Sequence, residues 1–201
     1  HEFSAGALRE SRKYGREVDA VARAGRLDLR ELPLVTIDGE DARDFDDAVW
    51  AEQTAGGFRL IVAIADVSHY VRPGTELDSG ARERATSVYF PTRVLPMLPE
   101  ALSNHLCSLV PKVDRLCMAC DMHVTRAGRV TSSSFHVAVM RSAARLTYTQ
   151  VAAMLEGRDE KARREFAAVL PVLECLQRVY LALRQWREAR GALDFEAPEV
   201  R

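Results

Sequence analysis

The chain has 201 residues, of which 47% are hydrophobic and 28% are charged, and its formal net charge is −1. These values are typical of a globular domain with a buried core. They exclude a membrane-spanning helix, because no stretch approaches the roughly 18 consecutive apolar residues that one requires. They also give no overall basic signal for nucleic acid, so any such groove has to be local.

The elements predicted in chain order place strands first and helices later. Residues 1–30 are highly charged, and we expect a linker helix there that enters the domain. A buried strand over residues 32–38 follows, and then a hairpin of residues 48–53 and 58–71 that turns at "TAGG". Thr75 is expected to cap a short helix, and residues 99–109 form another helix with proline in its first turn.

The second half of the chain predicts one more hairpin and then helices. Residues 115–125 and 130–141 alternate as strands around the turn "RAGR". Residues 147–157 and 160–191 are helical in pattern, with an interruption near Pro171 and an end at Gly191. "ALDFE" then begins another strand. This order predicts an α+β fold, with helices packed on a mixed or antiparallel sheet.

Two of the four cysteines, Cys117 and Cys120, form a C-x-x-C pair inside a predicted strand. Residues three apart on a strand face opposite sides, so the two thiols diverge. No second such pair completes a zinc site. We therefore expect structural thiols in a reducing compartment, and a cytoplasmic protein with no membrane partner.

The stretch "DGEDARDFDDAV" concentrates carboxylates directly after the first buried strand. We select Asp38, Asp44, Asp46 and Asp47 as a candidate site. Carboxylates held close together repel and raise one another's pKa, so a buried group of them needs a cation. Mg²⁺ suits these oxygen ligands, and such a site can activate water for attack on a phosphodiester. A structural cation site and a solvated acidic loop are the alternatives.

The motif "TIDGEDARDFDDAV" resembles the signature of the ribonuclease II/ribonuclease R family, within its catalytic RNB domain. The segments "VAIADVSHYVRPGTELDSGARERATSVYFP", "LPEALSNHLCSLVPKVDRLCMACDM", "ARLTY" and "RGALDFEAPE" resemble it too. The resemblance implies that residues 31–201 are the N-terminal part of that domain. It further implies a magnesium-dependent exoribonuclease that degrades single-stranded RNA processively from the 3′ end to nucleoside 5′-monophosphates, in RNA decay and quality control.

By the same resemblance, the four aspartates match the family's acidic positions. Asp38 and Asp47 match direct metal ligands, Asp46 the most sensitive catalytic position, and Asp44 the fourth carboxylate. Tyr89 matches an aromatic residue that stacks on a nucleotide near the 3′ end, and Phe195 matches the opposite aromatic. From the sequence alone, both aromatics are equally compatible with core packing.

The family's catalytic domain is longer than this chain, and its later "SPIRRY"-type motif carries an arginine that contacts the phosphate. Its cold-shock domains precede the catalytic domain and its S1 domain follows. We expect this chain to be a segment of such a protein, with residues 1–30 leading from the cold-shock region, and to be weakly active or inactive alone. The alternative is a catalytically incompetent module of the same fold that binds RNA or protein.

Overall fold

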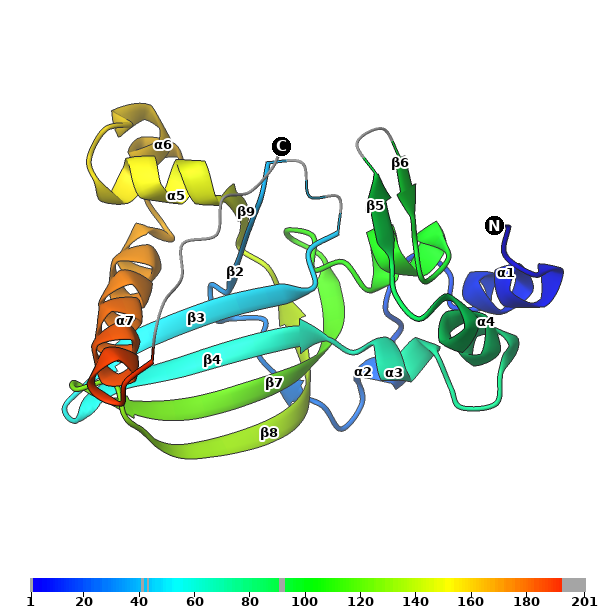
Figure 1. Cartoon of the computed structure of the whole chain (residues 1–201), viewed down its shortest axis with the longest axis horizontal. Helices are drawn as coiled ribbons and strands as arrows, with labels where there is room; N and C mark the ends of the chain where they lie inside the picture. Colours follow the sequence, from blue (N-terminus) through cyan, green and yellow to red (C-terminus); the bar gives the residue numbers. More distant parts are fainter. Residues whose placement is uncertain (1, 41, 43, 91–92, 193–201) are drawn as a thin grey trace.

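The computed structural model describes residues 2–40, 42, 44–90 and 93–192 (Figure 1). Within them, seven strands form one sheet in the order β1-β8-β7-β4-β3-β2-β9, and β5 and β6 form a separate ribbon. The strands of the sheet are β1 (Leu27–Asp28), β2 (Val35–Asp38), β3 (Asp47–Thr54), β4 (Gly57–Ala65), β7 (Asp114–Thr125), β8 (Val130–Arg141) and β9 (Ala144–Thr147). The ribbon comprises β5 (Val88–Phe90) and β6 (Arg93–Leu95).

Helices flank this sheet. They are α1 (Ala5–Arg12), α2 (Ala20–Arg23), α3 (Val67–Tyr70), α4 (Glu76–Arg84), the π-helix η1 (Ala101–Leu106), α5 (Tyr148–Leu155), α6 (Glu160–Glu165) and α7 (Leu170–Ala189). The predicted α+β class is confirmed, and the sheet is mixed. Its centre, β3-β4-β7-β8, is antiparallel, whereas β2 with β9 and β1 with β8 are parallel.

Apolar side chains on both faces of the sheet hold the layers together. On one face, α7 places Cys175 and Val179 in a cluster with Phe58 and Leu60 of β4. On the other face, Trp50 and Ile61 belong to a larger core that also contains η1 and part of α1. Figure 1 shows α7 lying across one end of β3 and β4, which leaves their opposite ends free to carry a site.

Residues 6–30 do not form the single helix that was predicted. α1 ends at Arg12 and α2 at Arg23, and the glycines that follow them, Gly15 and Gly25, have φ of +67° and +74°. Beyond Gly25 the chain enters β1, whose Leu27 pairs with Ala138 of β8. A distant strand therefore overrides the local helical pattern. The assignment of residues 1–30 to a linker stays a prediction.

The strand predicted over residues 58–71 is also too long. β4 ends at Ala65 because Asp66 turns the chain: its carboxylate accepts a 2.7 Å hydrogen bond from the Ser68 hydroxyl, and its carbonyl accepts one from the His69 amide. The short helix α3 follows. The helix predicted over residues 99–109 is present over a shorter range, with π geometry.

Several local signals are confirmed. The Thr75 hydroxyl accepts a 3.2 Å hydrogen bond from the Asp78 amide and caps α4. Pro171 lies in the first turn of α7, and Gly191 takes a φ of +81° just past its end. The cysteines are free, and Cys117 and Cys120 lie on opposite faces of β7. The strand expected at "ALDFE" lies outside the described residues. None of the described helices has the length and hydropathy needed to cross a bilayer.

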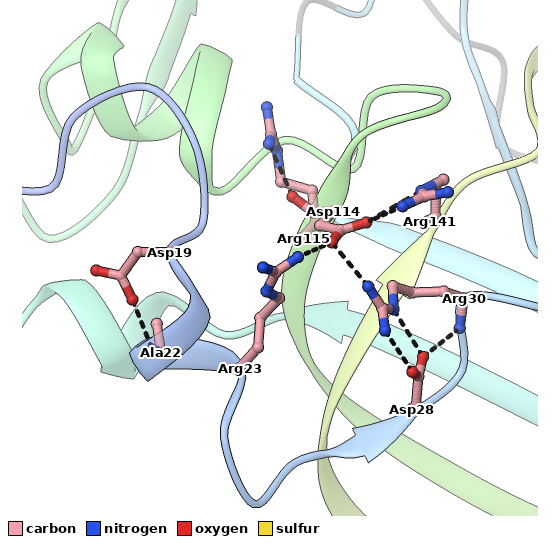
Figure 2. Close-up of polar contacts among 8 residues, drawn as sticks. All are labelled: Asp19, Ala22, Arg23, Asp28, Arg30, Asp114, Arg115 and Arg141. Atoms are coloured by element: carbon pink, nitrogen blue, oxygen red, sulfur yellow. Dashed lines mark hydrogen bonds and ion pairs between the residues drawn. The ribbon is translucent and has the colours of Figure 1, made fainter.

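A cluster of arginines around one carboxylate ties the N-terminal segment to the sheet (Figure 2). Asp114, at the start of β7, accepts hydrogen bonds at 2.6 Å from Arg23, 3.2 Å from Arg30 and 2.7 Å from Arg141. Its side chain is only 11% exposed. Although burial opposes ionisation, the donors on Arg141 and Arg23 lower the pKa of Asp114 below its usual value.

We expect Asp114→Asn to reduce the free energy of unfolding at neutral pH by about 2 kcal/mol, because three charge-assisted contacts lose their anion. The stabilisation is present above the ordinary aspartate pKa of 3.8 and is lost as pH falls through the lowered pKa of the folded state. Urea unfolding at several pH values measures both effects. The control is Glu188→Gln, which removes an exposed partner of Arg184 and should cost less than about 0.5 kcal/mol.

Candidate functional site

The four predicted aspartates lie where β2 ends and β3 begins. Asp38 is the last residue of β2, and Asp47 is the first residue of β3. β2 is held between β3, through the pair Val35–Val49, and β9, where Asp38 pairs with Thr147. The connection between β2 and β3 carries Asp44 and Asp46. The sheet therefore returns the chain so that the carboxylates at both ends of this loop lie on one edge of the molecule.

A buried aromatic ring anchors the acidic loop. Phe45 is only 2% exposed, although it stands between two carboxylates. Its amide donates a 3.1 Å hydrogen bond to the Ser108 hydroxyl, and its carbonyl accepts a 2.8 Å hydrogen bond from the Leu109 amide. Both polar groups of its backbone are thus satisfied by the segment after η1. Because apolar and acidic residues alternate here, Asp44 and Asp46 lie at the surface on either side of the buried Phe45.

The carboxylates interact with one another. Partial burial raises the pKa of Asp46, and the charges of the three other aspartates raise it further. Partial burial and the charge of Asp38 raise the pKa of Asp47 in the same way. The side chains of Asp46 and Asp47 nevertheless reach solvent. The structure therefore brings all four predicted residues into one electrostatic group that favours a bound cation.

The donor set fits a hard divalent ion that retains much of its water. None of the ion pairs among the described residues joins a cation to Asp38, Asp44, Asp46 or Asp47. Within the same residues, no three acidic, histidine or cysteine side chains converge closely enough to enclose an ion. Mg²⁺ commonly binds through one or two carboxylates, with water and substrate phosphate completing its shell. Such a site needs no closed protein cage.

Tyr89 stands beside the cluster on the β5–β6 ribbon. Its side chain is 66% exposed, which excludes the core packing that the sequence left open. Together with Asp44, Pro96 and Asn104 it borders a small cavity of about 70 Å³. Partial burial and the charge of Asp44 raise the pKa of Tyr89. The predicted aromatic residue is therefore within electrostatic range of the carboxylates.

A second exposed tyrosine lies near the aspartates and was not selected from the sequence. Tyr148 is 64% exposed, and partial burial and the charges of Asp38 and Asp47 raise its pKa. A reciprocal capping pair, Thr147 with Gln150, fixes it at the start of α5. It borders an open hollow of about 680 Å³ that also reaches Asp47. The sequence signal is its place in "ARLTY", immediately after a strand that pairs with β2.

Phe195, the other predicted aromatic, lies outside the described residues. Its role stays a prediction, as do the individual roles of the four aspartates. What the described residues establish is a group of carboxylates with two exposed tyrosines close enough to be affected by their charges.

Comparisons with known proteins agree on one family. The RNB domain family matches residues 26–201. Ribonuclease R of Escherichia coli (strain K12) is 59% identical over 186 residues, which cover 92% of this chain and 23% of that protein. Ribonuclease R of Vibrio cholerae is 54% identical over 202 residues, which cover 100% of this chain and 24% of that protein. The chain thus spans about a quarter of the length of these curated relatives.

A solved structure has the same arrangement of elements. Mycoplasma genitalium ribonuclease R in complex with ribose-methylated single-stranded RNA superposes with a TM-score of 0.87 at 32% sequence identity. The match covers 98% of this chain and 31% of that one.

We expect Asp46→Asn to stabilise the chain slightly in the presence of EDTA, because it removes one charge from a group of mutually repelling carboxylates. The gain should be at most about 1 kcal/mol, since water screens these exposed groups. Added Mg²⁺ should stabilise the unsubstituted chain more than the variant. Thermal unfolding with EDTA and with Mg²⁺ measures both effects.

The matched control is Glu40→Gln, which removes a negative charge from the same loop but leaves the four aspartates intact. It should preserve the stabilisation by Mg²⁺. If Asp46→Asn and Glu40→Gln respond identically to Mg²⁺, the carboxylate cluster is not the ion's binding site.

Proposed function

The chain belongs to the RNB domain family, in which its relatives are ribonucleases R, and on this premise we propose that it carries the hydrolytic site of a magnesium-dependent 3′-to-5′ exoribonuclease. The substrate is single-stranded RNA, and the products are nucleoside 5′-monophosphates released processively. The observation that carries the proposal is the group of four aspartates: partial burial and the charges of the other three raise the pKa of Asp46, and no ion pair among the described residues neutralises the group.

The four aspartates have different positions, and we propose a different role for each position. Asp38 and Asp47 lie at the ends of two neighbouring strands, and we propose that they hold the ion directly. Asp44 and Asp46 flank the anchored Phe45 and reach solvent, where water and phosphate enter. Bound Mg²⁺ supplies electrostatic stabilisation of the phosphodiester while water attacks it. Carboxylates held by the strand ends and by the buried Phe45 would orient that water.

The exposed tyrosines suit a single strand of RNA. A nucleic base can stack on the face of Tyr89 whatever its sequence, which is what a processive enzyme requires. A relative of known structure was solved with single-stranded RNA, and its fold matches almost all of this chain. We propose that Tyr89 and Phe195 hold the terminal bases while Tyr148 contacts the nucleotide next to the ion.

The wider protein context follows from the family. We propose that the chain acts together with cold-shock and S1 domains, which gather single-stranded RNA, and with the arginine motif that follows in the family's catalytic domain. The free thiols fit a reducing cytoplasm. The alternative function is an RNA-binding or protein-binding module without catalysis. Retention of all four carboxylates argues against it, because crowded like charges destabilise a fold that has no use for them.

The test of catalysis is a chimaera in which this chain replaces the aligned segment of Escherichia coli ribonuclease R. With 5′-labelled single-stranded RNA and Mg²⁺, we expect a ladder that shortens from the 3′ end. EDTA or Asp46→Asn should abolish it, a loss of at least about a thousandfold, because charge stabilisation in the transition state is removed. The chain alone should be weakly active or inactive.

Glu40→Gln in the chimaera is the matched control and should retain activity. A chimaera that binds RNA but does not cleave it, with the parent enzyme active, would support the binding module instead.

We expect Tyr89→Ala to weaken binding of single-stranded RNA to the Asp46→Asn chimaera by about 1–3 kcal/mol, roughly fivefold to 150-fold. Tyr89→Phe should retain most of the affinity, since it keeps the aromatic face. Equal affinities of the alanine and phenylalanine variants would show that Tyr89 does not stack on a base. Fluorescence anisotropy with labelled RNA measures the difference.

A further inference from the structure

One arginine on the neighbouring strand contacts the acidic loop at two points. Arg145 lies in β9, directly opposite Thr36 of β2. Its Nη2 donates a 2.7 Å hydrogen bond to the carbonyl oxygen of Ala42. Its Cζ atom lies 4.1 Å from the centroid of the Phe45 ring. A single guanidinium therefore holds both a backbone carbonyl in the loop and the aromatic ring that anchors it.

These contacts bridge two separate elements. The loop begins where β2 ends, and Ala42 turns back to donate a 3.2 Å hydrogen bond to the Gly39 carbonyl. Arg145 reaches over this turn from β9, whose register against β2 places Thr147 opposite Asp38. The side chain thus fixes the loop relative to the strand that carries the first carboxylate.

Arg145 does not neutralise the aspartates. Among the described residues, no ion pair joins it to any member of the cluster. Its planar guanidinium instead combines a fork of donors with a flat face for stacking, a combination that lysine lacks. An exposed arginine without such contacts typically contributes little to a fold.

We propose that Arg145 is a positioning residue for the carboxylate cluster: it holds the loop so that the aspartates on either side of Phe45 face the ion together with those at the strand ends. The inference rests on the proposed function, because it takes the aspartates to be ligands of a divalent cation. It assigns to Arg145 an effect on ion affinity that is independent of RNA.

Whether replacement of Arg145 weakens or strengthens cation binding distinguishes a positioning role from a purely electrostatic one. Loss of a nearby positive charge should by itself strengthen binding of a cation to the cluster. Loss of a positioning contact should weaken it, typically by about 10-fold to 100-fold for residues that orient metal ligands. Arg145→Met removes the charge and the donors but retains a long side chain over the Phe45 ring. Arg145→Lys retains the charge and loses the planar fork.

The experiment measures Mn²⁺ binding to the 201-residue chain without RNA, by electron paramagnetic resonance, with Mg²⁺ as competitor. We expect Arg145→Met to weaken Mn²⁺ binding about tenfold relative to the unsubstituted chain. Arg145→Lys should weaken it less. Arg129→Met is the matched control, since it removes an exposed arginine from the β7–β8 turn at the far end of the sheet. It should leave affinity unchanged.

Hydrogen exchange of the segment from residue 39 to residue 46 provides a second readout, and Arg145→Met should accelerate exchange there but not in the β7–β8 hairpin. Equal or tighter Mn²⁺ binding by Arg145→Met, with the unsubstituted chain binding normally, would overturn this inference and leave the proposed function intact. Failure of the unsubstituted chain to bind Mn²⁺, when the Escherichia coli enzyme binds it, would overturn both.

Discussion

The site depends on the burial of one phenylalanine between two carboxylates. Mutual repulsion among the four aspartates would by itself spread the loop and separate them. Burial of an aromatic side chain such as Phe45 contributes about 2–3 kcal/mol, which exceeds the repulsion between screened surface charges. Its backbone hydrogen bonds to Ser108 and Leu109 fix its direction as well as its depth. Asp44 and Asp46 are therefore held in place by the apolar residue between them.

The segment that receives Phe45 is itself fixed from the sheet. Arg115 of β7 is almost fully buried, and its guanidinium donates to the carbonyl oxygens of His105 at 3.0 Å and Ser108 at 2.9 Å. Burial lowers the pKa of Arg115, because no described carboxylate pairs with it and carbonyl oxygens compensate only part of its lost hydration. A continuous series of contacts thus runs from the central strand β7, through the turn after η1, to the backbone of Phe45.

Local patterns in the sequence predicted the features that depend on neighbouring residues: hairpins, helix ends and the acidic loop. Alternating residues identified both hairpins, Thr75 marked a helix start, Pro171 marked a break between helices, and the crowding of aspartates identified the acidic loop. Sequence-based prediction failed where pairing between distant segments of the chain determines the local structure. Leu27 and Asp28 were included in a predicted helix because their partner in β8 lies over a hundred positions away. Tyr148 was missed for the same reason, since it approaches Asp38 only when β9 lies alongside β2. Arg145 looked like one charge among many until that register placed it over Phe45.

The parallel pairing of β2 with β9 also affects how the protein assembles its candidate site. The hairpins β3–β4 and β7–β8 join neighbouring segments and can form early, whereas β2 and β9 begin at residues 35 and 144 and must close a long loop before they pair. They share only four residue pairs at the edge of the sheet. The aspartates are close together in the chain from the moment of synthesis, but Arg145 and Tyr148 join them only when this last edge closes. The acidic loop is therefore complete in the chain well before the residues of β9 and α5 that surround it, so the candidate site is among the last parts of the protein to assemble.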